Sequence, residues 1–301
     1  MLMPLDRLSP FYPGLMGVDG SDVPRGIRSA AQGVVYFVDA SHPDASDAHD
    51  GTDPEHPLAT IQEGIDKNNA TIDWAVVPPY KGQNWIVIAP GVYDENLTPA
   101  YYCKMIGRGV ARGDDCAAHV SPTAGSAMAG TGIALHLINM RFSANTAVPV
   151  LDFETFNSCV VEDCMITDHN AGLATIGLDM TSAGGSAILR SRFNYNTNPL
   201  TIGIRSTGAF YDCKVIGCEI HAVTTGIDLS AAGLCANALI AHNYIARPVT
   251  GINDGVGDTL VVDNWITAST AAITHAAAGT MCIANHVINN VAGAVELAAT
   301  D

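Results

Sequence analysis

Side chains able to carry acid–base chemistry are sparse in this chain of 301 residues, which has 14 basic and 30 acidic side chains. Asp212, Lys214 and Glu219 lie within one short segment, and no other lysine follows residue 104. A carboxylate near a basic side chain can remove and return a proton, so these three residues are the candidate catalytic group. The alternative, which we favour, is that they form a solvated edge of the fold.

A second candidate group lies nearer the N-terminus, where Asp44, Asp47, Asp50 and Asp53 place a carboxylate at every third residue. An EF-hand loop alternates its calcium ligands at every second residue, so this spacing is not that motif. One interpretation is a surface Ca²⁺ site. The other, which we favour, is a turn-rich loop whose Asp side chains bond to their own backbone. We expect no other cofactor.

The elements that position such residues follow from an internal repeat in the second half of the chain. Apolar anchor residues recur at intervals of 27, 27, 25, 21 and 21 residues: Ile166, Phe193, Ile220, Ile245, Ile266 and Val287. Five positions before each anchor stand Val161, Ile188, Val215, Ile240, Val261 and Cys282. A further apolar column follows the anchors: Leu178, Ile204, Ile227, Ile252, Ile273 and Val295.

A repeat of this length, with two short strands and no helical period, predicts a parallel β-helix. Each repeat then forms one coil, and equivalent residues of successive coils stack about 4.8 Å apart. Upstream, Val34–Asp39 and Trp85–Ala89 are rich in β-branched and aromatic residues and predict strands. Leu58–Lys67 has helical spacing and predicts a short helix. Pro and Gly interrupt residues 1–33, which we expect to form an extended arm before a β-helix of residues 34–301.

Charged residues fall into register on the predicted coils. Asp179, Arg205 and Asp228 occupy consecutive coils, as do Asp163 and Arg190. Side chains stacked at this distance attract when their charges alternate, so we interpret both sets as ladders that fix register rather than as catalytic residues.

Asparagine recurs in the same way. Asn243, Asn264 and Asn285 stand two positions before their anchors on three consecutive coils. This column predicts an internal amide ladder at a tight turn, because Asn tolerates unusual backbone angles.

Three sequence features together resemble a known group of proteins. The run GTDPEHPLATIQEGID is followed by WIVIAPGVYDENLT and then by repeats of the form NxIxxxxTGI. The chain resembles the right-handed parallel β-helix proteins of the pectin-lyase-like superfamily, and most closely the branch found among phage tailspikes and virion surface proteins. The resemblance covers about residues 34–301. It implies an all-β, single-stranded right-handed solenoid whose N-terminal end is covered by the short helix.

The resemblance defines fold better than activity, because this fold carries both enzymes and inert proteins. Polygalacturonase-like members use NTD, GDD, GHG and RIK motifs, of which this chain has only Gly113–Asp114–Asp115. Calcium-dependent lyases need an Asp cluster of the DDGxD kind, which the sequence lacks. We therefore interpret the GDD match as chance.

An outward column stands immediately before the anchors: Met165, Arg192, Glu219, Tyr244, Trp265 and His286. Tyr244, Trp265 and His286 are expected to stack on three consecutive coils as an aromatic strip, of the kind that contacts sugars or proteins. Since virion β-helix proteins are commonly trimers, our first interpretation is a homotrimer interface. Glycan binding is the second, and simple surface packing the third.

Composition limits the partners and the compartment. A net charge of −16 would be repelled by a phosphate backbone, so we expect no nucleic-acid partner. The N-terminal run MLMPLDRLSP lacks the features of a secretory signal, and the uncharged stretches 121–140 and 264–295 are too polar to enter a membrane. The eight cysteines show no CxxC or zinc spacing, so we expect free, mostly buried thiols.

Three functions stay open. The favoured one is a structural virion surface protein of a bacteriophage, such as a capsid decoration, head-fibre or tail protein. It would be made in the host cytoplasm and attached to capsid or tail proteins through residues 1–33. The second is a tailspike-type depolymerase, a lyase or glycoside hydrolase of host surface glycan. The third is a non-catalytic glycan-binding adhesin.

Overall fold

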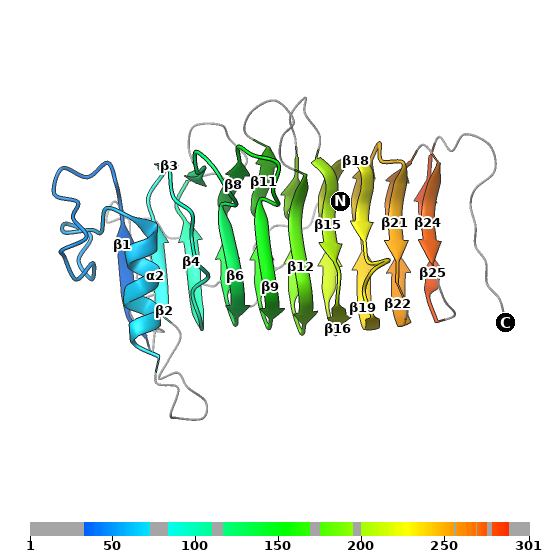
Figure 1. Ribbon diagram of the computed structural model, residues 1–301, viewed down its shortest axis with the longest axis horizontal. Coiled ribbons are helices and arrows are strands. Elements are labelled where there is room, and N and C mark those ends of the chain that lie inside the picture. Colours follow the sequence, from blue (N-terminus) through cyan, green and yellow to red (C-terminus); the bar gives the residue numbers. More distant parts are fainter. Residues whose placement is uncertain are drawn as a thin grey trace, which may run out of the picture.

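The computed structural model describes residues 33–72, 84–109, 117–168, 175–194, 200–255, 257–268, 270–275 and 279–288. Within these ranges the chain winds into a solenoid whose coils follow one another in chain order along the long axis (Figure 1). The predicted fold class is confirmed as an all-β parallel β-helix with a short helix at its N-terminal end. Of the predicted arm, all but Gly33 lies outside the described ranges.

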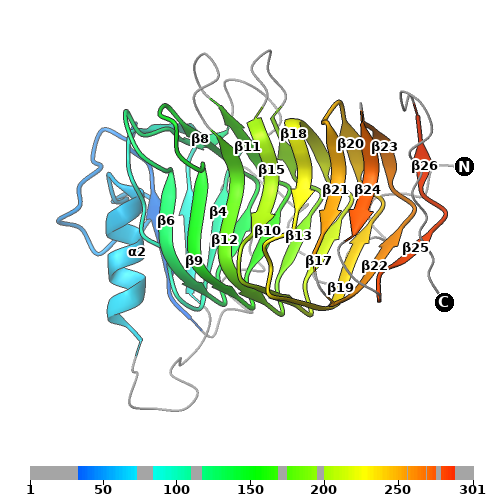
Figure 2. The same cartoon turned by 45° about the vertical axis from the view of Figure 1, so that its right-hand side comes forward.

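The coils contribute strands to three faces, and neighbouring coils pair in parallel (Figure 2). The first face contains β1 (Val35–Val38), β2 (Asn84–Ile88), β4 (Cys103–Gly107), β7 (His136–Ile138), β10 (Val160–Glu162), β13 (Ala187–Leu189), β17 (Lys214–Ile216), β19 (Leu234–Ala241), β22 (Gly257–Val262) and β25 (Met281–Ile283). The second face contains β3 (Gly91–Tyr93), β5 (Ala118–Val120), β8 (Met140–Ala144), β11 (Met165–Asp168), β14 (Arg192–Phe193), β18 (Glu219–Asp228), β20 (Tyr244–Ala246), β23 (Trp265–Thr267) and β26 (His286–Val287).

The third face contains β6 (Met128–Ile133), β9 (Leu151–Asn157), β12 (Ile176–Gly184), β15 (Leu200–Ser206), β16 (Ala209–Tyr211), β21 (Thr250–Asp254) and β24 (Ala271–His275). Strand β18 continues from the second face into the third, and β19 continues from the third into the first. The prediction of two strands per coil was therefore wrong. The further apolar column belongs to this third face.

The predicted register is confirmed in all three columns. The anchors pair in series on the second face, from Ile166 with Phe193 to Ile266 with Val287. The residues five positions earlier pair on the first face, and the column from Leu178 to Ile273 pairs on the third. Val295 lies outside the described residues. These side chains point inward and form the core.

A left-handed residue makes the corner between the first and second faces. In each of six coils, the residue three positions before the anchor has a positive φ between 46° and 67°. They are Asp163, Arg190, Gly217, His242, Asp263 and Ala284. One residue of this conformation turns the chain sharply without lengthening the coil.

The asparagine ladder follows that corner. Asn243 Nδ2 donates to Asn264 Oδ1 at 2.9 Å, and Asn264 Nδ2 donates to Asn285 Oδ1 at 2.9 Å. The Asn243 and Asn264 backbone N–H groups also donate to the next side-chain oxygen, at 3.0 Å. The ladder is confirmed, but the unusual backbone angle belongs to the residue before each Asn.

The ladder column continues toward the N-terminus with Cys164, Ser191 and Cys218. The Cys164 N–H donates to Ser191 Oγ at 3.1 Å, so the hydroxyl takes the place of an amide. Burial raises the pKa of the Cys164 and Cys218 thiols to about 12, which disfavours the reactive thiolate. The seven described cysteines carry free thiols, and six of them are buried.

Helix α2 (Ile61–Ala70) lies at the N-terminal end of the solenoid (Figure 1). Its Ile61 and Ile65 are fully buried, and Thr60 caps its first turn. The Glu95 carboxylate accepts hydrogen bonds from the backbone N–H groups of Ile61 and Gln62, both at 2.9 Å. The predicted helix is thereby confirmed with its start shifted by three residues, and the strands predicted at 34–39 and 85–89 form β1 and β2. No helix in the described residues is long and apolar enough to span a membrane.

Asn264→Ala tests the ladder. The substitution leaves the buried Asn243 N–H without its acceptor and removes three side-chain donor contacts. A buried unsatisfied group costs about 1–3 kcal/mol, so we expect a loss of about 3 kcal/mol in the free energy of unfolding. Asn285→Ala also removes an acceptor of the Asn264 N–H, but at a partly exposed position that water can reach, so it is expected to cost less, about 1 kcal/mol. Urea titration followed by circular dichroism measures both, and equal losses would contradict the ladder's graded burial.

Candidate functional site

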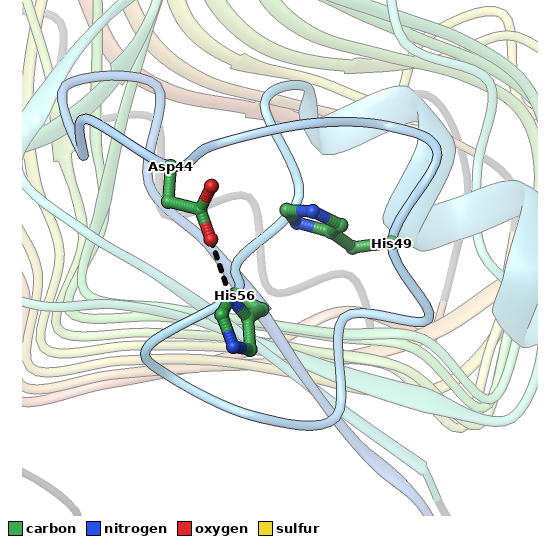
Figure 3. Close-up of side chains that lie close together, drawn as sticks. All are labelled: Asp44, His49 and His56. Atoms are coloured by element: carbon green, nitrogen blue, oxygen red, sulfur yellow. Dashed lines mark hydrogen bonds and ion pairs between the residues drawn. The ribbon is translucent and has the colours of Figure 1, made fainter.

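Three potential metal ligands converge in the loop between β1 and α2. Asp44, His49 and His56 each direct one ligand atom toward the others, and these atoms all lie within 4.8 Å of one another. Figure 3 shows the Asp44 carboxylate facing the His56 ring, with the His49 ring approaching from the other side of the loop. The Asp44 and His56 side chains are 55% and 59% exposed, so the group is open to solvent.

The electrostatics of this group come from the Asp44–His56 contact. The hydrogen bond to His56 lowers the pKa of the Asp44 carboxyl, and the same bond raises the pKa of His56. The nearby carboxylates Asp53 and Glu55 raise the pKa of His56 further. The loop therefore presents negative charge around two imidazoles, an arrangement that attracts a cation.

The rest of the loop is fixed by short polar turns. Asp47 accepts hydrogen bonds from the backbone N–H groups of Ala59 and Thr60 at 2.9 Å, and Asp50 accepts one from Thr52 at 2.9 Å. Asp53 accepts one from the Glu55 N–H at 3.0 Å. Three of the four predicted calcium candidates thus bond to nearby backbone, as the favoured interpretation expects, and only Asp44 joins the ligand group.

Sequence reasoning missed His49 and His56. Their signal is present in the printed sequence, because three of the chain's ten histidines, His42, His49 and His56, lie at intervals of seven residues among the loop's aspartates. The interval corresponds to no standard ligand motif. The fold of the loop, rather than the spacing, brings two of the three together with Asp44.

The predicted catalytic group does not assemble. Asp212 lies at a left-handed corner and accepts a hydrogen bond from Asn237 Nδ2 at 3.1 Å. Lys214 lies exposed on β17 of the first face. Glu219 lies on the second face, where it pairs with Arg192 at 2.8 Å and with His221 at 3.1 Å. Glu219 therefore forms its ion pairs on a different face from the one that carries Lys214. The GDD match at residues 113–115 lies outside the described residues.

An open groove of about 590 Å³ runs across the first face toward its C-terminal end. Lys214 and Asp258 line it with opposite charges. Its apolar wall includes Leu239, Leu260 and Met281, which stack in register on β19, β22 and β25. The groove carries no aromatic side chain among its lining residues, so the stacking that sugars favour is absent from it.

The predicted aromatic strip lies on the outer surface of the second face. Tyr244 pairs in register with Trp265, and Trp265 with His286. Tyr244 is 42% exposed and Trp265 46%, and the Trp265 and His286 ring centroids are 4.4 Å apart. The three residues are thus confirmed to lie in register on consecutive coils, and a ring contact is formed by Trp265 and His286. At the other end of the same column Met165 is buried.

The predicted charge ladders are formed in part, because Asp228 lies in register with Arg205 but accepts its hydrogen bonds from Ser230 and Asn253. Arg205 donates to Asp179 through Nε at 2.9 Å and through Nη2 at 2.5 Å. Arg190 donates to both Asp163 oxygens at 3.2 Å and also pairs with Glu162. The hydrogen bond to Asp179 raises the pKa of the Arg205 guanidinium. These bonds join neighbouring coils, so the charged side chains help to hold one coil in register with the next.

A buried polar pair lies in the wall of the second face. His119 Nε2 and Ser143 Oγ are 2.8 Å apart, and their exposed fractions are 6% and 0%. A histidine within reach of a hydroxyl is also the beginning of a nucleophilic site. Here both groups are buried, so the pair contributes to the packing of the second face and is not accessible to a substrate.

Comparisons with known proteins found a distant structural similarity. A pectin methylesterase from Aspergillus niger is a similar solved structure, with 11% identity over 85% of each chain and a TM-score of 0.37. No protein-family model and no curated protein matches this chain. The class of the molecule is that of the all-β parallel β-helices, as its strand pairing shows.

Arg205→Ala tests the charge ladder. Without the guanidinium on the following coil, Asp179 lies beside Asp152, its in-register neighbour on β9, and loses the positive charge that offsets their repulsion. We expect a loss of about 1 kcal/mol in unfolding free energy at neutral pH and low salt, and a smaller loss at high salt. Urea titration at two salt concentrations measures this, with Arg247→Ala at an exposed position as the control. A salt-independent loss, or an equal loss at Arg247, would contradict the ladder.

Proposed function

We propose that this protein is a structural component of a phage virion surface, assembled as a homotrimer through the outer strip of Tyr244, Trp265 and His286. The observation that carries the proposal is the exposure of this stacked strip on the last described coils of the second face. Large aromatic side chains held in a continuous exposed row are typical of protein contacts.

Charge supports self-association at this strip. A chain of net charge −16 repels a second copy over most of its surface. The strip itself has no acidic member, and the column's acid, Glu219, is paired with Arg192. A contact through Tyr244 and Trp265 would bury apolar surface in a column whose carboxylate, Glu219, is already paired.

A structural role fits the use of charged residues. The candidate catalytic residues do not converge, and Glu219, Asp179 and Asp163 all form ion pairs between or along coils. The virion setting and an attachment role for residues 1–33 rest on the resemblance of residues 34–301 to virion surface β-helices. Capsid or tail proteins would be the partners of that arm.

A glycan-binding function is the second candidate, and the same outer strip of Tyr244, Trp265 and His286 favours it. Exposed aromatic rings in register on successive coils offer flat faces on which sugar rings can stack. Such binding would belong to an adhesin or to a depolymerase acting on host surface glycan.

Trp265→Ala with Tyr244→Ala tests the interface. We expect the double variant to lose the trimer, because an interface anchor of this kind contributes about 2 kcal/mol or more. Sedimentation velocity of the full chain measures the oligomer. Val92→Ala removes a residue 69% exposed near the other end of the second face and should leave the trimer intact. A trimer that survives the double substitution would overturn the proposed interface. Intact trimers that lose glycan binding would favour the adhesin.

Deleting residues 1–33 tests attachment. The deletion should abolish binding to virus particles while circular dichroism of the remaining β-helix stays unchanged, since β1 begins at Val35. Co-sedimentation with particles lacking the protein measures attachment. A truncated chain that still sediments with the particles would refute the role of the arm.

A further inference from the structure

We propose that Asp44, His49 and His56 form a binding site for a divalent transition-metal ion, with Zn²⁺ as the expected occupant. The proposal is independent of the trimer interface, because the cluster lies in the loop before α2 and the strip lies on β20, β23 and β26.

The donor set selects the kind of ion. Two imidazole nitrogens and one carboxylate oxygen suit zinc and its neighbours, whereas calcium takes six to eight oxygen ligands. Asp47, Asp50 and Asp53 already bond to backbone N–H groups, so they do not complete an oxygen cage around Asp44. Zinc therefore replaces calcium, which we considered from the spacing of the aspartates alone, as the expected ion of this loop.

The distances require only side-chain rotation. Zinc bonds to nitrogen and oxygen are about 2.0–2.2 Å long, so ligand atoms around one ion lie up to about 4 Å apart. The three ligand atoms here already lie within 4.8 Å of one another. Asp44 and His56 contact each other directly and are more than half exposed, so their side chains can separate to admit the ion (Figure 3).

The surrounding backbone orients His49. Its Nδ1 lies 3.4 Å from the Pro57 carbonyl oxygen, so a proton on Nδ1 leaves Nε2 as the free ligand atom. A hydrogen-bond acceptor on the ring nitrogen that does not bind the ion commonly fixes the tautomer of a metal-binding histidine. The Pro57 oxygen also accepts a hydrogen bond from the Ser46 N–H at 3.1 Å, which holds the two sides of the loop together.

The loop is also anchored to the solenoid on either side of the site. The Phe37 N–H on β1 donates to the Gly51 carbonyl at 2.7 Å, and the Leu58 N–H donates to the Phe37 carbonyl at 2.9 Å. The His56 N–H is held by Asp53 at 3.1 Å. Such a preformed frame means that little backbone ordering is needed when the ion binds.

An ion bound here would join the beginning of the loop, at Asp44, to its end, at His56. Three protein ligands leave a position for water, so the site would be exchangeable and solvent-accessible. Because the ligands come together only in the folded loop, binding would stabilise the N-terminal end of the solenoid around α2.

Calorimetric titration of the untagged full chain with ZnCl₂ tests the proposal, since a polyhistidine tag would itself bind the ion. We expect one site whose affinity falls at least about tenfold in His49→Ala and in His56→Ala. His242→Ala is the matched control, because His242 is an exposed histidine 3.9 Å from Asp263 and belongs to no group of three potential metal ligands in the part of the chain that the structure describes. It should bind as the wild type does.

A second measurement protects against loss of folding in the variants. Zn²⁺ should raise the thermal midpoint of the wild type and of His242→Ala, and should leave that of His49→Ala unchanged. Wild-type protein that shows no zinc binding, or binding that His49→Ala does not weaken, would overturn the site. Preferential binding of Ca²⁺ over Zn²⁺ would overturn the assignment of the ion. Each result can be read whether or not Trp265→Ala changes the oligomer.

Discussion

The register between successive coils is the constraint on which the rest of this structure depends. A shift of one residue would turn the inward anchors Ile220, Ile245 and Ile266 toward solvent and their polar neighbours into the core. The left-handed corner protects that register, because the step from the first-face column to the anchor is five residues in all six coils. Variation in coil length from 27 to 21 residues falls at the other two corners.

The same constraint explains what the sequence could predict. Inward positions are recognisable because stacking demands apolar side chains at each level, as at Val161, Ile188 and Val215. The Asp179–Arg205 pair and the Tyr244–Trp265 stack then follow by counting outward from the anchors. In these cases the spacing of residues in the sequence determines which residues are neighbours in the structure, since each coil repeats the geometry of the one before it.

Other features depend on conformation that residue type does not reveal. The corner is made by Asp163, Gly217 and Ala284 alike, so neither charge nor size marks the left-handed position. The convergence of His49 with His56 depends on turns inside a non-repetitive loop, where no neighbouring coil supplies a template. Lys214 and Glu219 are close in sequence, yet the corner between them places them on different faces.

The two ends of the solenoid differ in the side chains that they place on the surface. At the N-terminal end α2 buries Ile61 and Ile65, and the loop before it gathers polar ligands outside a closed core. Toward the C-terminal end the outward columns pass from the paired charges of Arg192 and Glu219 to the exposed rings of Tyr244 and Trp265. Since copies of a chain of net charge −16 repel one another where acids are exposed, that change along one column would direct the proposed association to the later coils. An ion held by the N-terminal loop would lie far along the chain from this contact. It would stabilise the end of the solenoid at which the stack of coils begins.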